Sequence, residues 1–190
     1  MANGMYHYLA QAWKKPDQET LRQRMTDWRS TDSIVKVSKP LRVDRARQIG
    51  YKAKKGFVVV RVRVRRGGHT RTRPNAGRRS KRLHTRKNLK MSYQWIAEQR
   101  VARKFVNLEV LNSYNIGKDG MHYFYEVILV DPEMPEIKND KTMSWIAKPA
   151  NNKRVMRGLT SSAKKSRGLS SKSRQLKVRP SIRARGRLGK

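Results

Sequence analysis

Cysteine is absent from the 190-residue sequence, which excludes a disulfide framework and zinc sites built on thiolate ligands. Long apolar runs are absent too. The longest are short aliphatic stretches such as Val127–Val130, far below the about 20 residues that a membrane-spanning helix needs. The first residues, MANGMYHYLAQAWKKP, have polar side chains every few positions and lack the apolar core of a signal peptide. These absences fit a reducing compartment and predict no membrane span.

Acidic residues are scarce. The chain has 47 Lys and Arg against 13 Asp and Glu, which gives a net charge of +34. All carboxylates lie outside two windows, 45–97 and 141–190, and these windows hold 34 of the 47 cations. Charge that is segregated in this way indicates a surface that binds a polyanion, whereas mixed signs are typical of an ordinary solvated surface. Nucleic acid is the first candidate partner and an anionic membrane the second.

Familiar catalytic motifs are missing as well. The four histidines, His7, His69, His84 and His122, do not have metal-ligand spacing and no carboxylate cluster accompanies them. The sequence contains neither a P-loop nor a glycine-rich dinucleotide loop. The two acid-free windows lack the carboxylates that metal-dependent nucleases use. We therefore expect no enzymatic activity, no cofactor, no metal and no small-molecule substrate.

The apolar residues that are present predict both helices and strands. Helical spacing is found in residues 5–15, in the segment that follows Pro16, and after Ser92, a residue type that favours the N-cap position. Alternation and turn residues predict four strands, in SIVKVSKP and in residues 57–66, 107–116 and 121–130. We predict an α+β fold, namely a small, mainly antiparallel four-stranded sheet packed with helices, plus a long basic loop and a C-terminal extension.

Composition also divides the chain into three segments. Residues 1–40 hold the N-terminal helices and the first short strand. Residues 41–150 form an α/β core that carries a basic loop at 67–90. Residues 151–190, rich in Ser, Gly, Lys and Arg, are predicted to be a basic RNA-binding extension rather than a second domain.

The segment FVVVRVRVRRGG, from Phe57 to Gly68, alternates valine with arginine. In a strand, the even-numbered valines point to one face, and Arg61, Arg63 and Arg65 point to the other, about 6.6 Å apart. Arginines this close repel one another unless anions screen them, and a planar guanidinium binds phosphate oxygens in pairs. We therefore expect a phosphate backbone across this face. The alternative is a solvated face, or a strand edge guarded by charge against aggregation.

The basic loop and the tail extend this pattern. Residues 69–90 have almost no apolar content, so we expect them to order only on a polyanion. In RGLTSSAKKSRGL, cations alternate with hydroxyl residues and glycines, which suits phosphate contacts; the alternative is a nonspecific basic tail. The candidate RNA-binding residues are Lys52, Lys54, Lys55, Arg61, Arg63, Arg65, Arg66, Arg71, Arg73, Arg78, Arg79, Lys81, Arg82, Arg86, Lys87, Lys153, Arg154, Arg157, Lys164, Lys165, Arg167, Arg174, Lys177, Arg179, Arg183 and Arg185.

Three functions compete for such a chain. A structural RNA-binding protein is favoured, because a long irregular basic loop suits folded RNA better than a regular duplex. A DNA-compacting chromatin protein is the alternative. Binding to a membrane surface would need a basic amphipathic helix with a large apolar face, which the basic windows lack.

Five segments add a resemblance to a known family. In this order, GYKAKKGFVVVRVRVRRGG, EVLNSYNIGKDG, YEVILVDP, SWIAKP and RGLTSSAKKSRGL resemble the signature segments of the fifteen-e protein of the archaeal and eukaryotic large ribosomal subunit. The resemblance covers nearly the whole chain, and GRRSKR and KVRPSIRARGRLGK are similar to archaeal members.

The resemblance implies an antiparallel α/β sandwich with four main strands and long extensions buried in ribosomal RNA. It also implies a non-catalytic, cytoplasmic role on the ribosome. The expected partners are large-subunit rRNA and neighbouring ribosomal proteins, with no membrane and no homo-oligomer.

Overall fold

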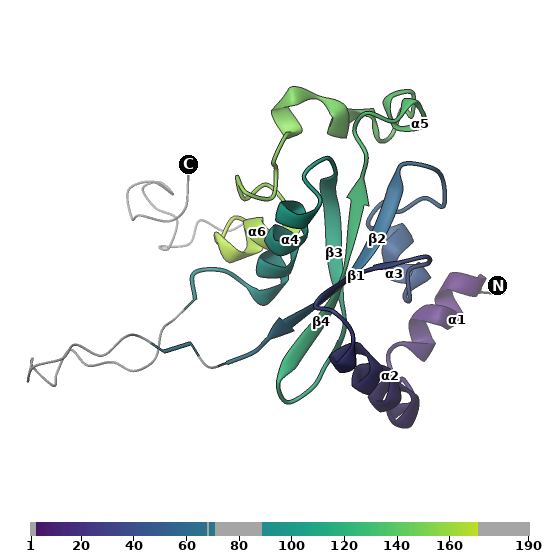
Figure 1. Cartoon of the computed structure of the whole chain (residues 1–190). Coiled ribbons are helices and arrows are strands. Elements are labelled where there is room, and N and C mark those ends of the chain that lie inside the picture. Colours follow the sequence, from purple (N-terminus) through teal and green to yellow (C-terminus); the bar gives the residue numbers. More distant parts are fainter. Residues whose placement is uncertain (1–2, 68, 71–88, 171–190) are drawn as a thin grey trace, which may run out of the picture.

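A four-stranded antiparallel sheet forms the centre of the computed structural model, which describes residues 3–67, 69–70 and 89–170. The strand order is β1-β2-β4-β3 (Figure 1). The strands are β1 Ile34–Val37, β2 Phe57–Arg65, β3 Glu109–Lys118 and β4 His122–Val130. The long strands β2 and β4 pair over their whole length, from Phe57 opposite Val130 to Arg65 opposite His122. β3 and β4 form the expected hairpin, and β3 carries two register shifts typical of β-bulges.

Two of the helices begin where the sequence supplies a side-chain cap. Asp17 accepts a hydrogen bond from the N–H of Thr20 at 2.9 Å at the start of α2, and Ser92 accepts one from the N–H of Trp95 at 3.2 Å at the start of α4. The helical elements are α1 Met5–Ala12, α2 Gln18–Ser30, α3 Val43–Gln48, α4 Tyr93–Lys104, α5 Pro135–Lys138, the 3₁₀ turns η2 Ser144–Ala147 and η3 Pro149–Asn151, and α6 Ser161–Ser166.

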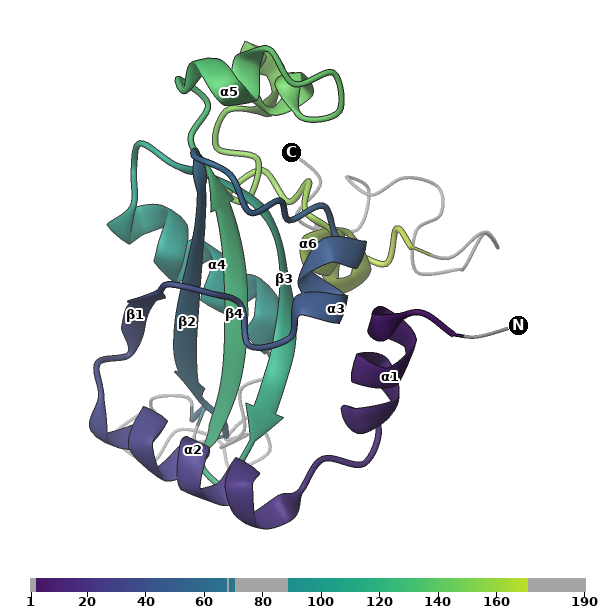
Figure 2. The same cartoon turned by 90° about the vertical axis from the view of Figure 1, so that its right-hand side faces the viewer.

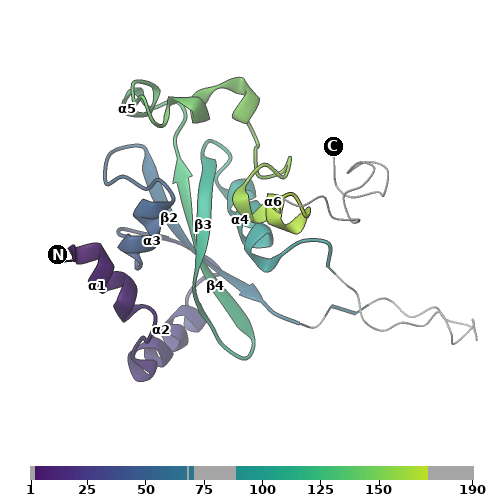
Figure 3. The same ribbon diagram turned by 180° about the vertical axis from the view of Figure 1, so that it is seen from behind.

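One face of the sheet packs against α4 and α6, which lie on the same side of it (Figure 3). The predicted valine face of β2 points here, and Val60, Val62 and Val64 are buried against Trp95 and Val101 of α4. β4 contributes its odd-numbered residues to this face, among them Tyr123 and Tyr125. Burying branched aliphatic and aromatic side chains between a helix and a sheet is the main stabilising term of this layer.

The opposite face is covered by α2 and α3, and α1 lies outside them (Figure 2). Trp28 of α2 packs its ring against Phe124 of β4, with ring centroids 5.2 Å apart. Farther along this face, Ile137 of α5 and Ile146 of η2 are buried in the same cluster. The segment SWIAKP therefore packs back on the core.

These observations confirm the predicted α+β fold and its four strands. The structure adds that residues 151–169 contribute Val155 and Ala163 to the core between α4 and the sheet, although their composition resembles that of a tail. In the described part of the chain, no helix is both long and apolar enough to cross a bilayer.

Candidate nucleic-acid interface

Arg61 of β2 lies in a partly buried site under the end of α2. Its Nη2 donates a hydrogen bond to Thr31 Oγ1 at 3.1 Å, and its guanidinium lies 5.3 Å from the centroid of the Trp28 ring. Burial lowers the pKa of Arg61, and the negative charges of Glu126 and Asp27 oppose that shift. An arginine remains protonated in either case. Arg61 therefore holds α2 against the sheet through a cation–π contact and a hydrogen bond.

Arg63 and Arg65, the next two arginines of this face, differ in their exposure and in their contacts. Arg63 donates a hydrogen bond from Nη1 to the backbone carbonyl oxygen of Arg29, in the last turn of α2, where the helix dipole favours a cation. The side chain of Arg65 is exposed. In the expected row of three guanidinium groups, α2 therefore covers the first two and leaves only that of Arg65 exposed.

Arg66 follows the strand and lies over the hairpin. Its guanidinium is 5.0 Å from the centroid of the Tyr123 ring, and its Nη1 donates to the carbonyl oxygen of Asp119 at 2.7 Å. The same hairpin turn is closed by Asp119, whose N–H donates to the carbonyl oxygen of His122 at 3.0 Å. Arg66 thus anchors the end of β2 to the turn between β3 and β4.

The lysines that precede β2 also have partners within the chain. Lys52 Nζ and Lys54 Nζ lie 2.8 Å and 2.6 Å from the same carboxylate oxygen of Asp140. The hydrogen bonds from the ammonium groups of Lys52 and Lys54 hold the pKa of Asp140 well below its usual range. Lys55, by contrast, is exposed.

Arg154 is the most firmly held cation of the C-terminal segment. Its Nη1 donates to the carbonyl oxygens of Val110 and Leu111, at 2.8 Å and 2.6 Å, and its guanidinium lies 5.0 Å from the centroid of the Trp145 ring. Burial lowers the pKa of Arg154. These contacts satisfy carbonyl groups beside the β3 bulge, so Arg154 joins the C-terminal segment to the sheet.

Arg157 and Arg167 also donate to backbone carbonyls within their own segment. Arg157 Nε donates to the oxygen of Asn152 at 3.1 Å, and Arg167 Nη1 donates to the oxygen of Gly158 at 2.9 Å. Among the residues that the structure describes, five of the predicted RNA-binding cations are exposed and their side chains make no hydrogen bond or ion pair with another described residue. We call these the exposed cations: Lys55, Arg65, Lys153, Lys164 and Lys165.

The last two exposed cations are held in place by a buried carboxylate. Glu98 of α4 is fully buried and accepts hydrogen bonds from the hydroxyl groups of Ser113, Thr160 and Ser162, the last two at 2.7 Å and 2.6 Å. Burial raises the pKa of Glu98, and these hydrogen bonds oppose the rise. Because Thr160 and Ser162 begin α6, this cluster fixes the helix that carries Lys164 and Lys165.

Several predicted RNA-binding residues lie outside the described part of the chain. They are Arg71, Arg73, Arg78, Arg79, Lys81, Arg82, Arg86 and Lys87 of the loop, and Arg174, Lys177, Arg179, Arg183 and Arg185 of the tail.

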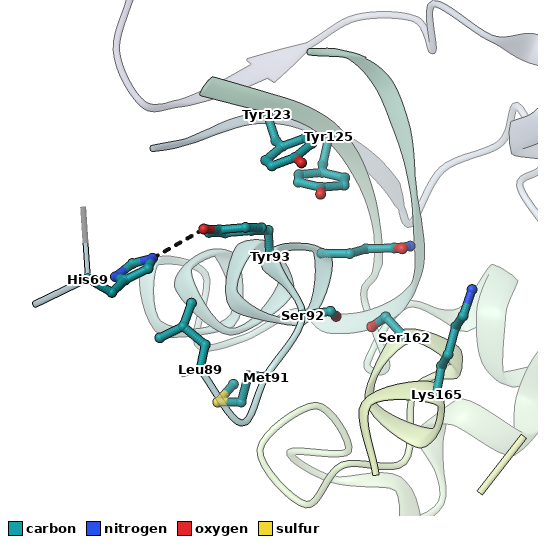
Figure 4. Close-up of a pocket in the computed structure, with 10 residues that line it drawn as sticks. His69, Leu89, Met91, Ser92, Tyr93, Tyr123, Tyr125, Ser162 and Lys165 are labelled. Atoms are coloured by element: carbon teal, nitrogen blue, oxygen red, sulfur yellow. Dashed lines mark hydrogen bonds between the residues drawn. The ribbon is translucent and has the colours of Figure 1, made fainter. Parts of the chain in front are cut away.

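A pocket lies beside α6, at the N-terminal end of α4 (Figure 4). Tyr93, Tyr123 and Tyr125 line it together with Leu89, Met91 and Lys165. The ring centroids of Tyr93 and Tyr123 are 5.0 Å apart, and those of Tyr123 and Tyr125 are 6.1 Å apart. Three aromatic rings from two elements therefore line the same pocket as an exposed lysine.

Comparison with known families shows to which family the chain belongs. A family model described as Ribosomal L15 matches residues 4–185, almost the full length of the chain. The chain belongs to the ribosomal L15e family. The match confirms the resemblance carried by the five sequence segments.

Membership of the ribosomal L15e family identifies a protein of the large ribosomal subunit that functions in translation. The family implies rRNA and ribosomal proteins as partners, a location in the ribosome in the cytoplasm, and a role that is generally structural rather than enzymatic.

Two features of this L15e family member were not predicted from its sequence. The tyrosine cluster could have been suspected from YFY at 123–125, because alternate residues of a strand share a face. The Glu98 cluster had no such signal, because its hydroxyl partners lie 15, 62 and 64 positions away along the chain.

Proposed function

We propose that this protein binds and stabilises folded large-subunit rRNA by neutralising phosphate charge. The exposed cations, the basic loop at 67–90 and the extension at 151–190 make the contacts. The observation that supports this proposal is the excess of cations in windows 45–97 and 141–190, which hold 34 of the 47 Lys and Arg and no Asp or Glu. Phosphate groups are the partner that such an excess favours, since each neutralised phosphate releases counterions.

Three carboxylates of the described chain already have partners within the fold. Asp140 pairs with Lys52 and Lys54, and Glu98 and Glu126 are buried and accept hydrogen bonds within the fold. Around α6, the described residues place Lys164 and Lys165 at the surface. These two lysines, fixed on one short helix, are the sharpest place to test the proposal.

The test compares two double substitutions that remove the same charge. Lys164→Gln with Lys165→Gln removes two exposed cations of α6. Lys14→Gln with Lys15→Gln removes two adjacent exposed lysines after α1, outside both acid-free windows. The affinity of each full-length protein for a large-subunit rRNA fragment is measured from low to high salt.

We expect the log–log salt slope to fall by roughly 0.7–0.9 for each phosphate contact that is lost. The α6 variant should lose up to twice this amount, and the control should keep the slope of the unmodified protein. A salt-independent affinity of the unmodified protein would overturn the electrostatic proposal. Competition by duplex DNA at matched salt gives a second readout, and a clear preference for DNA would favour a chromatin protein instead.

A further inference from the structure

The pocket beside α6 has the size and lining of a binding site. Its volume is about 650 Å³, within the range of roughly 300–1,000 Å³ that is usual for ligand pockets. In Figure 4, Tyr93 crosses its middle, Tyr123 and Tyr125 lie above that ring, and Lys165 lies on the side opposite His69. Its described lining contains no carboxylate. The pocket therefore combines an aromatic surface with positive charge.

The tyrosine rings form a stepped surface. The planes of Tyr93 and Tyr123 are inclined by 31°, and those of Tyr123 and Tyr125 by 30°. Tyr125 is buried in the core and supports the other two, which are only partly buried. A partly buried ring that rests on a rigid core loses little conformational entropy when a base packs against its exposed part.

Hydrogen bonds fix the edge of this surface. Tyr93 Oη accepts a hydrogen bond from the N–H of Gly67 at 3.0 Å and lies 3.3 Å from Nε2 of His69, with which it shares another. The guanidinium of Arg66 covers Tyr123 from one side at 5.0 Å. The rings are thus held in position before any ligand arrives, which lowers the cost of binding.

We propose that this pocket takes one unstacked nucleotide of rRNA, with its base against Tyr93 and Tyr123 and a neighbouring phosphate at Lys165. Single-stranded RNA is recognised mainly by bases that stack on aromatic side chains beside a cation for the backbone. The inference rests on the proposed function, because it names the part of the RNA that this site binds. The lack of a lining carboxylate and the presence of Lys165 favour a nucleotide over a cationic or purely apolar protein side chain.

The direct test uses the unmodified full-length protein and a photoreactive probe. The probe is a nine-nucleotide oligouridylate with 5-iodouridine at its centre, which crosslinks to an aromatic ring against which it stacks. Its control is a nine-base-pair RNA duplex that carries the same nucleotide in a base pair. We expect a crosslink to Tyr93 or Tyr123 with the single strand and none there with the duplex.

A substitution adds an energetic readout. Tyr123→Leu keeps an apolar side chain but removes the stacking ring, and Tyr8→Leu makes the same change on the exposed face of α1. Losing one base–aromatic stack corresponds to a loss of about 5- to 150-fold in affinity. We expect this loss for Tyr123→Leu with the single strand alone, and an unchanged salt slope, because no charge is removed.

The outcomes separate this inference from the function on which it rests. Crosslinks confined to other residues, or an unchanged single-strand affinity of Tyr123→Leu, overturn the nucleotide pocket while a steep salt slope upholds charge-driven RNA binding. An equal loss with duplex and single strand also overturns the pocket, because stacking requires an unpaired base. A flat salt dependence overturns the proposed function itself. If Tyr123→Leu does not fold, judged by circular dichroism, the crosslink on the unmodified chain decides.

Discussion

The carboxylate of Glu98 lies 2.6 Å from the hydroxyl group of Ser162, which donates a hydrogen bond to it across 64 positions of sequence. The hydroxyl groups of Ser113 and Thr160 converge on the same carboxylate. This cluster joins α4, β3 and the start of α6 in one buried site. It makes the first residues of the basic C-terminal segment part of the folded core, so that the lysines of α6 are presented in a fixed position.

Glu98→Gln should change how stability depends on pH. Because burial raises the pKa of Glu98, the folded protein binds its proton more tightly than the unfolded chain. Glu98 therefore contributes most below the unfolded value of about 4.3, and its contribution is lost as pH rises through the raised pKa. The substituted glutamine side chain does not ionise. The free energy of unfolding, measured in urea, should therefore decline less between pH 4 and pH 8 for the variant than for the unmodified protein. Parallel stability curves for the two proteins would contradict this prediction.

The three arginines of β2 should separate into two classes. We expect Arg61→Ala and Arg63→Ala to lower the free energy of unfolding by about 1–2 kcal/mol each, because each loses a contact that holds α2. Arg65→Ala, at an exposed site, should change stability by less than about 0.5 kcal/mol and should weaken rRNA binding. Chemical denaturation and RNA titration of the same three variants measure both effects. Equal stability losses at all three positions would argue against this division.

Asp140→Asn should move stability and RNA affinity in opposite directions. The pKa of Asp140 is lowered by Lys52 and Lys54, so its contribution to stability is present above about 3.9, the unfolded value, and is lost as pH falls through the lowered pKa. The substituted asparagine side chain retains an oxygen that can accept from the N–H of Thr142 but releases both lysines.

We expect a small loss of stability at neutral pH that salt diminishes, together with tighter rRNA binding at low salt. Unfolding and binding curves at two ionic strengths measure these changes, with Glu136→Gln, a nearby charge change outside any described ion pair, as the control. Unchanged RNA affinity would indicate that Lys52 and Lys54 serve the fold alone.

Elements that depend on neighbouring residues were predictable. Ser92 caps α4 as its residue type predicts, and Asp17 caps α2 in the same way, because in each case a side-chain oxygen reaches an N–H three positions ahead. The hairpin strands follow from alternation, although β3 extends to Lys118, two positions beyond the predicted end. Strand alternation likewise placed the valines and the arginines of β2 on opposite faces, and the valine face is buried as expected.

Contacts between distant segments were not predictable in the same way. No pattern near Arg61 or Arg63 indicates that the end of α2, about 30 positions earlier, lies over them. The carbonyl partners of Arg154 lie more than 40 positions away, and Tyr93 of α4 meets Tyr123 of β4. Each of these contacts exists because hydrophobic burial brings two elements together, and the polar partners follow from that packing.

The sequence by itself indicated a polyanionic partner, because net charge and its segregation do not depend on how the chain folds. It also determined the α+β class, since periods of 2 and 3.6 residues select strands and helices. Which cations hold the fold together and which remain exposed was decided by the tertiary structure alone. An arginine under α2 or in the core binds carbonyls and aromatic rings, whereas the same residue type at the surface is available to a phosphate. That difference arises from packing in three dimensions, which a linear pattern of charges does not record.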